Sequence, residues 1–312
     1  MKKKNRLSAG AAWIALIALI ASSCAWDRIE RPESNETNKD EVRFSSNIIT
    51  QSLGLRMSGN EWEENDEIGV YMLDENTTDV VEEKANVTFV AQADGAMGTF
   101  KAKDLKIYYP DNGAKVRFMS YYPYQSSVAN GVYLVDVSNQ ASQSDIDLLY
   151  SFEKDAFYSK GTTSKTVSLS FNHCLTKLKV NVKSGEGLTE EDLEDLQVTF
   201  SGLHTQVEFN LLTGLLGEPI GAVSDITPKS VAAPANFVAG YESILLPMTD
   251  IPAGAKMVFS LKNGDQFSWN FAYELEASNM YVYNVTINRS EVQVEATINE
   301  WTDGGNSNID AE

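Results

Sequence analysis

The chain of 312 residues contains little cysteine and little histidine. It has two cysteines, Cys24 and Cys174, and two histidines, His173 and His204. Small secreted domains that depend on disulfides carry many more cysteines than this. A disulfide framework is therefore excluded. We expect the fold to be stabilised by the burial of apolar side chains, and hydrophobic residues make up 43% of the sequence.

Recognisable catalytic motifs are also missing. The sequence has no G-x-S-x-G, H-E-x-x-H or C-x-x-C motif and no glycine-rich phosphate loop. His173 and Cys174 are adjacent, so in a strand they point to opposite faces and do not form a nucleophilic pair. We predict that both residues are structural, that the protein is not an enzyme and that it needs no cofactor.

Basic residues are scarce as well. The formal net charge is −19, from 25 Lys and Arg against 44 Asp and Glu. Four of the cations (Lys2, Lys3, Lys4 and Arg6) stand at the N-terminus, so 21 remain beyond it and the net charge there is −23. A surface this acidic repels nucleic acid, which we exclude as a partner.

A long apolar run is absent too. The run from Ala9 to Ala21 is shorter than the roughly 20 residues that cross a bilayer. It follows four cations and precedes Ala21-Ser22-Ser23-Cys24, which is the layout of an export signal with small residues at the cut. A cysteine directly after the cut is typical of a bacterial lipoprotein. We therefore predict a signal peptide over residues 1–23, lipid attachment at Cys24 and a polar tether over residues 24–41; the alternative is an ordinary secreted protein.

Metal sites are not indicated. WTDGGNSNID offers Asp303, Asn306, Asn308 and Asp310, and another segment offers Asp136, Asp145 and Asp147. Neither has the spacing of a calcium loop, so we interpret both as solvated loops and predict no metal. An acidic run from Glu61 to Glu67 could supply the two carboxylates of a glycoside hydrolase, but nothing singles out a pair.

What the sequence does have, from Val42 onward, is apolar alternation with a period of two. QFSWNFAYEL, MYVYNVTI and VQVEATI each place aromatic or β-branched residues on one face and polar ones on the other. Turn signals such as Asn130-Gly131 and Asn263-Gly264 separate such runs. The pattern predicts an all-β chain of antiparallel sandwiches. One short helix is expected, at a capping box over Thr189–Asp192, with Leu188, Leu193 and Leu196 as its apolar stripe.

One long run changes faces. In VSLSFNHCLTKLKVNV, the apolar positions have one parity up to Leu175 and the other from Leu178. Because a strand turns its side chains over at every residue, we expect a bulge or a crossing between sheets near Thr176. We place a domain boundary here, with an N-terminal domain over residues 42–172 and a C-terminal domain over residues 173–312.

Six segments together resemble one protein family. They are EVRFSSNI (41–48), EWEENDEIGVYM (61–72), VRFMSYYPY (116–124), VSLSFNHCLTKLKVNV (167–182), ESILLPM (242–248) and ATINEWTDGG (296–305). In order and number they are similar to the fimbrillin family of Bacteroidales surface lipoproteins, which includes pilus subunits. One departure is Asn65, where the family commonly has glycine.

The resemblance implies a fold and a way of assembling. The fold would be two tandem transthyretin-like antiparallel β-sandwich domains. A protease would cut after a basic residue behind the first strand, the strand would leave, and the C-terminal strand of another subunit would fill the groove. The implied partners are other fimbrillin-type subunits, host or bacterial receptors or glycans, and the outer membrane through the lipid.

On this chain, the resemblance points to particular residues. The cut would follow Arg56, with Arg43 as the second choice; the alternative is that Arg56 is an ordinary loop cation. The removable strand would carry Val42, Phe44 and Ile48, and the donor strand Val292, Val294, Ala296, Ile298 and Trp301.

The chain after Trp301 is polar, which favours a tip, accessory or non-polymerising member over a stalk subunit. The rival hypothesis is a glycan-binding surface lipoprotein that uses Tyr121-Tyr122 and Tyr281-Tyr283.

Overall fold

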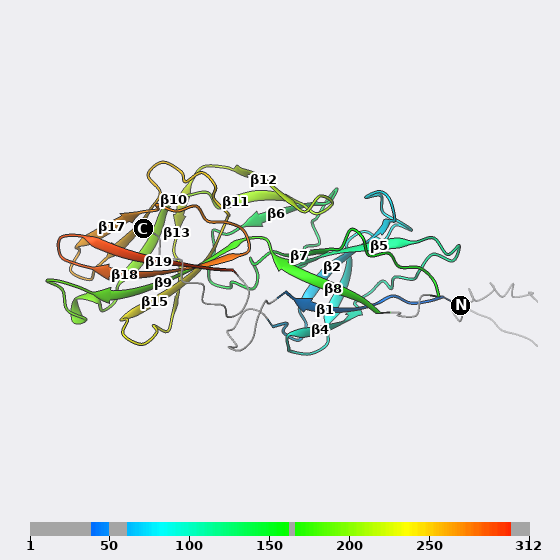
Figure 1. Ribbon diagram of the computed structural model, residues 1–312, viewed down its shortest axis with the longest axis horizontal. Coiled ribbons are helices and arrows are strands. Elements are labelled where there is room, and N and C mark those ends of the chain that lie inside the picture. Colours follow the sequence, from blue (N-terminus) through cyan, green and yellow to red (C-terminus); the bar gives the residue numbers. More distant parts are fainter. Residues whose placement is uncertain (1–38, 50–60, 162–165, 301–312) are drawn as a thin grey trace, which may run out of the picture. The chain divides into compact units, whose positions relative to one another are not determined.

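The computed structural model of the chain describes residues 39–49, 61–161 and 166–300. These residues are built almost entirely of β-strands, as the alternating sequence predicts, and the all-β class is confirmed (Figure 1). Their one helical segment is a single 3-10 turn, η2 (Glu191–Leu193).

The first body is a sheet that closes on itself. Its strands follow the order β1-β4-β3-β2-β5-β7-β8, and β1 also pairs with β8. Closure leaves no free edge in this sheet. Its strands are β1 (Arg43–Ile48), β2 (Glu67–Asp74), β3 (Val87–Ala91), β4 (Met97–Ala102), β5 (Val116–Tyr122), β7 (Leu149–Phe152) and β8 (Thr166–His173).

The rest of the described chain forms three open sheets. A five-stranded sheet has the order β14-β15-β9-β18-β19, a four-stranded one β13-β10-β16-β17 and a three-stranded one β12-β11-β6. Figure 1 shows β9, β15, β18 and β19 side by side. The bounds are β6 (Val132–Asp136), β9 (Thr176–Ser184), β10 (Gln197–Leu203), β11 (Gln206–Asn210), β12 (Leu215–Ile220), β13 (Ser224–Ile226), β14 (Lys229–Val231), β15 (Ala239–Leu245), β16 (Lys256–Ser260), β17 (Gln266–Asn270), β18 (Asn279–Ile287) and β19 (Val292–Glu300).

Strand direction differs from the expectation in two places. The pairs β1–β8 and β9–β18 are parallel, whereas the other described strand pairs are antiparallel. Parallel neighbours require a long connection, because the chain must return to the end of the sheet from which it started. Both pairs meet this condition. Strands β2 to β7 separate β1 from β8 along the chain, and β10 to β17 separate β9 from β18.

The described apolar side chains gather in two cores. One fills the barrel and includes Phe44, Trp62 and Phe171. The other extends under the open sheets and joins residues such as Tyr121, Leu178 and Phe200. Strand β6, which belongs to the predicted N-terminal domain, pairs with β11 of the predicted C-terminal domain. The boundary at residues 172 and 173 stays a prediction.

The change of face near Thr176 is a crossing between sheets, as the sequence predicts. Strand β8 ends at His173 in the barrel, and β9 begins at Thr176 in the five-stranded sheet. Each strand keeps its own alternation: Phe171 is buried in the barrel core, and Leu178 and Val180 are buried in the other core.

The predicted short helix is a single turn. Thr189 and Asp192 bond reciprocally: the Thr189 N–H and hydroxyl donate to Oδ2 of Asp192 at 2.7 and 2.8 Å, and the Asp192 N–H donates to Thr189 Oγ1 at 3.4 Å. Leu188, Leu193 and Leu196 are buried, as the apolar stripe predicts. The helix does not extend because Asp195 has a positive φ of 58° and Gln197 already begins β10.

Candidate functional site

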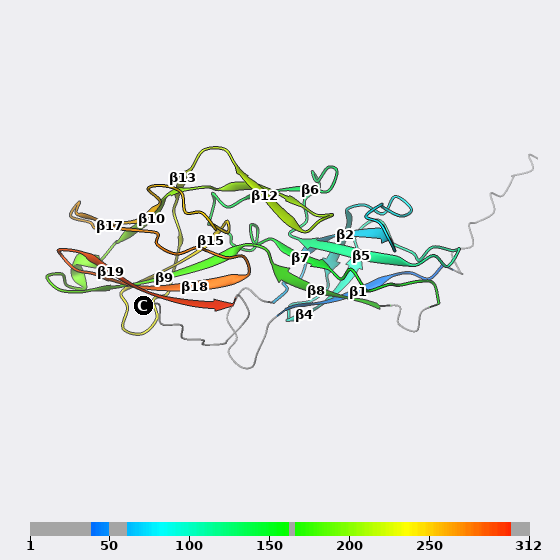
Figure 2. The same ribbon diagram turned by 45° about the horizontal axis from the view of Figure 1, so that its top comes forward.

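The first strand of the barrel is an interior strand. Strand β1 lies between β4, to which it is antiparallel, and β8, to which it is parallel (Figure 2). At its ends the Val42 N–H donates to the Ile107 carbonyl at 2.9 Å and the Ile49 N–H donates to the Phe171 carbonyl at 2.8 Å. Strand β1 is therefore the segment that completes the barrel, and without it two strands would have unpaired edges.

The inward side chains of β1 are deeply buried. Val42, which directly precedes β1, is 2% exposed, and Phe44 and Ile48 within it are 2% and 5% exposed; these are the residues predicted for the removable strand. Phe44 contacts the rings of Phe89 and Phe118 edge-to-face, with centroids 4.8 and 5.1 Å apart. These contacts, together with the backbone ladder, hold β1 in the barrel.

Sequence reasoning missed one inward residue of β1. Ser46 is 2% exposed and has the same parity as Phe44. Its Oγ is buried and has no hydrogen-bond partner among the described residues. Parity along the strand would have found it, but a serine gives no apolar signal.

The proposed donor, β19, lies at a sheet edge. Within the described residues it is hydrogen-bonded to one neighbour, β18, over the full length of both strands. Val292, Val294, Ala296 and Ile298 are half-buried and pack against the second core. Each of these inward residues is thus less buried than those of β1. This geometry also fits the alternative that β19 closes its own domain.

Several predicted site residues lie outside the described part of the chain. They are Cys24, Arg56, Trp301, Asp303, Asn306, Asn308 and Asp310. Arg43, the second choice for the cut, is described: its side chain is exposed, but its backbone is paired with Thr166 in the ladder.

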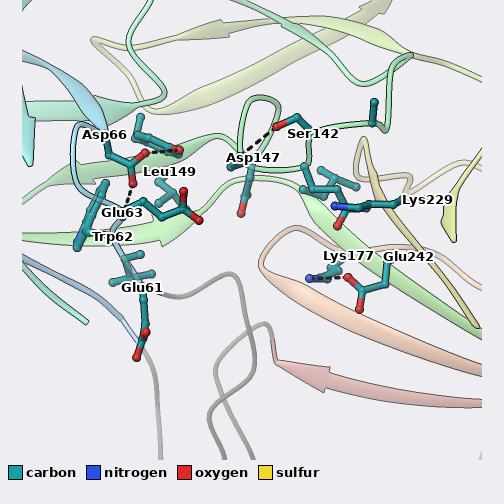
Figure 3. Close-up of a pocket in the computed structure, with 16 residues that line it drawn as sticks. Glu61, Trp62, Glu63, Asp66, Ser142, Asp147, Leu149, Lys177, Lys229 and Glu242 are labelled. Carbon is teal, nitrogen blue, oxygen red and sulfur yellow. Dashed lines mark hydrogen bonds and ion pairs between the residues drawn. The ribbon is translucent and has the colours of Figure 1, made fainter. Parts of the chain in front are cut away.

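The acidic run borders a pocket that is drawn in Figure 3. Glu61, Glu63 and Asp66 line it on one side and Lys177, Lys229 and Glu242 on another. Two carboxylates of the run have structural partners, Glu67, which pairs with Lys103, and Asp66. Asp66 accepts hydrogen bonds from the Glu63 N–H at 2.8 Å and the Tyr122 hydroxyl at 3.1 Å. Burial raises the pKa of Asp66, and these two hydrogen bonds oppose the rise.

On the other side of the pocket, the Glu242 carboxylate forms ion pairs with two lysines, Lys177 and Lys179. Glu242 Oε2 lies 3.1 Å from Lys177 Nζ, and Oε1 lies 3.4 Å from Lys179 Nζ. The side chains of Lys177 and Glu242 are 10% and 21% exposed. Burial acts to raise the pKa of Glu242, but the two ammonium groups outweigh burial and the pKa is lowered overall.

We expect Glu242→Gln to lower the free energy of unfolding by about 2 kcal/mol near pH 7, because Lys177 is left buried without its carboxylate; this is less than for a fully buried pair, since the site is partly solvated. A carboxyl whose folded pKa is lowered stabilises the fold above its ordinary pKa of 4.5 and ceases to do so as the pH falls through the folded value. The deficit of the variant should therefore shrink at acid pH. Urea unfolding monitored by circular dichroism from pH 3 to 8 measures it.

The matched control is Asp195→Asn. Asp195 pairs with Lys262 at 2.8 Å, and both side chains are 69% exposed. We expect no measurable change there, because exposed ion pairs contribute little. Equal effects of the two variants at all pH values would contradict the role given to Glu242.

His173 and Cys174 point in different directions, as the alternation predicts. His173 is buried, with Nδ1 3.0 Å from Asp147 Oδ1, and the Cys174 thiol is directed toward the Asn172 carbonyl at 3.8 Å. Burial and the nearby Asp147 carboxylate raise the pKa of the Cys174 thiol, which disfavours a reactive thiolate.

The aromatic residues that the glycan-binding hypothesis relies on are buried. Tyr121 and Tyr122 are 0% and 8% exposed, and Tyr281 and Tyr283 are 1% and 0% exposed. These four rings cannot form the exposed platform that sugar binding would need, so this part of the rival hypothesis is wrong. The physical reason is that Tyr121 and Tyr122 face different cores, so neither face of their strand is left to solvent.

Among the described residues, no group of three or more His, Cys, Asp and Glu side chains is placed to hold a metal ion. Asp136 accepts from the Ser138 N–H and from Gln206, whereas Asp147 contacts His173. In the same residues, no helix has the length and apolar character needed to span a membrane.

Comparison with known proteins gives consistent matches. The fimbrillin-like family model matches residues 56–301. A provisionally assigned fimbrium subunit, Fim1C of Bacteroides uniformis, is 32% identical over 270 residues, which cover 82% of this chain and 85% of that protein.

Solved structures agree on the fold. A provisionally assigned cell adhesion protein of Bacteroides uniformis has a TM-score of 0.70 at 28% identity, covering 86% of this chain and 99% of that one. A second, from Bacteroides ovatus, has a TM-score of 0.66 at 19% identity and covers 85% and 99%. From the family match over most of its length and the close relative, the chain belongs to the fimbrillin-like family.

Proposed function

We propose that this chain is a cell-surface pilus subunit or a tip or accessory adhesin, lipid-anchored at Cys24, and that it assembles with other fimbrial subunits by protease-triggered strand exchange. The assignment to a pilus rests on the fimbrillin-like family and on the 32% identical relative, which is described as a fimbrium subunit. The mechanism rests mainly on one observation: β1 is an interior strand of a closed barrel, located just before the stretch that contains Arg56.

The geometry supports the removal of β1. Its loss would uncover the inward faces of Phe89 and Phe118 and the free edges of β4 and β8. Exposed apolar surface and unpaired backbone groups both favour capture of another strand. An edge strand such as β19, paired on one side and half-buried, is the described segment best suited to enter that place.

The contact would join two different surfaces. A donor strand at one place on the chain and an acceptor groove at another make a heterologous interface, which repeats into a filament. A cut after Arg56 would also separate the folded body from the lipid on Cys24. The lipid would then hold the precursor at the outer membrane only until cleavage.

The test uses cells that display the membrane-bound precursor. We expect an arginine-specific protease to release a body that begins at Met57 and that forms oligomers visible by electron microscopy. An Arg56→Ala precursor, the matched control, should stay with the membrane fraction. Release elsewhere, or a released body that stays monomeric at high concentration, would exclude the mechanism.

A further inference from the structure

The pocket of Figure 3 has walls of opposite charge. Glu63 and Asp147 direct their carboxylates into it from one side, and Lys229 and Lys177 direct their ammonium groups into it from the other. An anion alone would meet the two carboxylates, and a cation alone would meet the two ammonium groups. A ligand that carries both charges is complementary to both walls.

The charged groups of the two walls have capacity left for a ligand. Among the described residues, neither the Glu63 carboxylate nor the Lys229 ammonium group forms an ion pair. The other two groups have partners: Asp147 Oδ1 lies 3.0 Å from His173 Nδ1, and Lys177 pairs with a glutamate of β15. A carboxylate has two acceptor oxygens and an ammonium group has three N–H donors, so both groups can bind one more partner.

The pocket also has apolar surface and a donor. It is lined by Trp62, Leu149 and Ile244, which are 1%, 3% and 1% exposed. The Trp62 Nε1–H is buried and has no acceptor among the described residues, which costs free energy. Edge-to-face contacts with Phe100 and Phe171, at 5.0 and 5.2 Å between centroids, hold the indole ring in place. A ligand with a carbonyl group and an apolar side chain would match these features.

Hydrogen bonds fix the two walls before any ligand binds. Gln140, which is 3% exposed, donates from Nε2 to the Val137 and Ile244 carbonyls at 2.7 and 2.8 Å, and its Oε1 accepts from the Ile244 N–H at 2.9 Å. These bonds attach the loop before Asp147 to β15. On the opposite wall, Lys229 belongs to β14, which is also paired with β15. A site held in this way loses little conformational entropy on binding.

We propose that this pocket binds a short zwitterionic peptide of about two residues. Its α-ammonium group lies between Glu63 and Asp147, and its carboxylate binds Lys229 and Lys177. The two charges of a free amino acid are on one carbon, whereas a dipeptide separates them by a peptide unit, which also supplies a carbonyl oxygen. The volume of the pocket, about 290 Å³, is at the small end of the range for ligand sites and agrees with a ligand of this size. This binding does not depend on strand exchange.

The experiment uses the mature, uncut protein that starts at Ala25. It is titrated with glycyl-leucine, with the N-acetylated form and with the C-terminal amide, and binding is followed by calorimetry and by the NMR signal of the Trp62 indole N–H. We expect glycyl-leucine to bind and to shift this signal. Each blocked form should bind at least about tenfold more weakly, because it lacks one of the two charges that the walls recognise.

Variants assign each charge to its wall. Glu63→Gln should weaken the binding of glycyl-leucine at least about fivefold but not that of the acetylated form, which has no ammonium group to lose. Lys229→Gln should do the same with the amide as the insensitive form. The matched controls are Glu64→Gln, an exposed neighbour that does not line the pocket, and Lys101→Gln, an exposed lysine in β4. Neither control should change the binding.

Three results would overturn the proposal. One is equal affinity for glycyl-leucine and its two blocked forms, because the charges would then have no part in recognition. Another is the absence of binding for both glycyl-leucine and glycyl-phenylalanine up to about 10 mM, which is weaker than ordinary ligand affinities. The third is an equal loss of affinity for Glu63→Gln and Glu64→Gln. None of these results would affect the protease test of strand exchange.

Discussion

Replacing Phe44 by alanine should lower the free energy of unfolding of the barrel by about 4 kcal/mol, within the range of about 3–5 kcal/mol seen for buried Phe→Ala changes. Phe44 is 2% exposed and stacks edge-to-face on Phe89 and Phe118. The change removes a whole ring from the centre of the core. The three aromatic residues belong to different strands, β1, β3 and β5, so the surroundings cannot easily close the cavity.

The measurement is urea unfolding of the mature, uncut protein, followed by circular dichroism and by tryptophan fluorescence. Trp62 belongs to the barrel core and reports on it. The matched control is Asn47→Ala in the same strand, whose side chain is exposed and for which we expect less than about 0.5 kcal/mol. A loss for Phe44→Ala below about 1 kcal/mol would show that β1 is not held by its apolar side chains.

Gly69→Ala should lower the free energy of unfolding by about 3 kcal/mol, at the upper end of what overpacking usually costs. Gly69 and Tyr121 are directly opposite each other on β2 and β5. A Cβ at Gly69 would lie 2.2 Å from Tyr121 Cε1 and 2.7 Å from Asn86 Oδ1. The ring cannot swing away at low cost, because Tyr121 is fully buried and its hydroxyl is 2.6 Å from Asn86 Oδ1 and 3.1 Å from the Gln125 carbonyl.

The control for this change is Gly217→Ala. Gly217 lies in the exposed edge strand β12, and a Cβ there would meet nothing closer than 3.4 Å, the Glu208 carbonyl. A double variant, Gly69→Ala with Tyr121→Leu, should be less destabilised than the sum of the two single changes, because the clash requires both partners. Additive effects, or equal losses for Gly69→Ala and Gly217→Ala, would contradict the packing argument.

The contact between Gly69 and Tyr121 also explains residues in two of the segments that resemble the fimbrillin family. EIGVYM contains Gly69 and VRFMSYYPY contains Tyr121. The sequence showed both segments but gave no reason for a glycine in an otherwise β-branched and aromatic run. The structure supplies it: the glycine leaves room for a ring from the neighbouring strand.

The sequence by itself determined the strand content, the change of sheet near Thr176 and the inward faces of the first and last described strands. It could do so because alternation is a local property: each side chain's face follows from its neighbours in the chain. The buried leucines around Thr189–Asp192 followed in the same way. Their adjacency in the sequence also indicated that the side chains of His173 and Cys174 point in different directions.

Only the tertiary structure decided which strands are neighbours. The parallel pairing of β1 with β8, the place of Ser46 against Gly98 and the two lysines around Glu242 join residues that lie far apart in the sequence. The same is true of the tyrosines that looked available for glycan binding, since burial on both faces of a strand depends on what packs there. These features arise from long-range packing, which alternation along one strand does not encode.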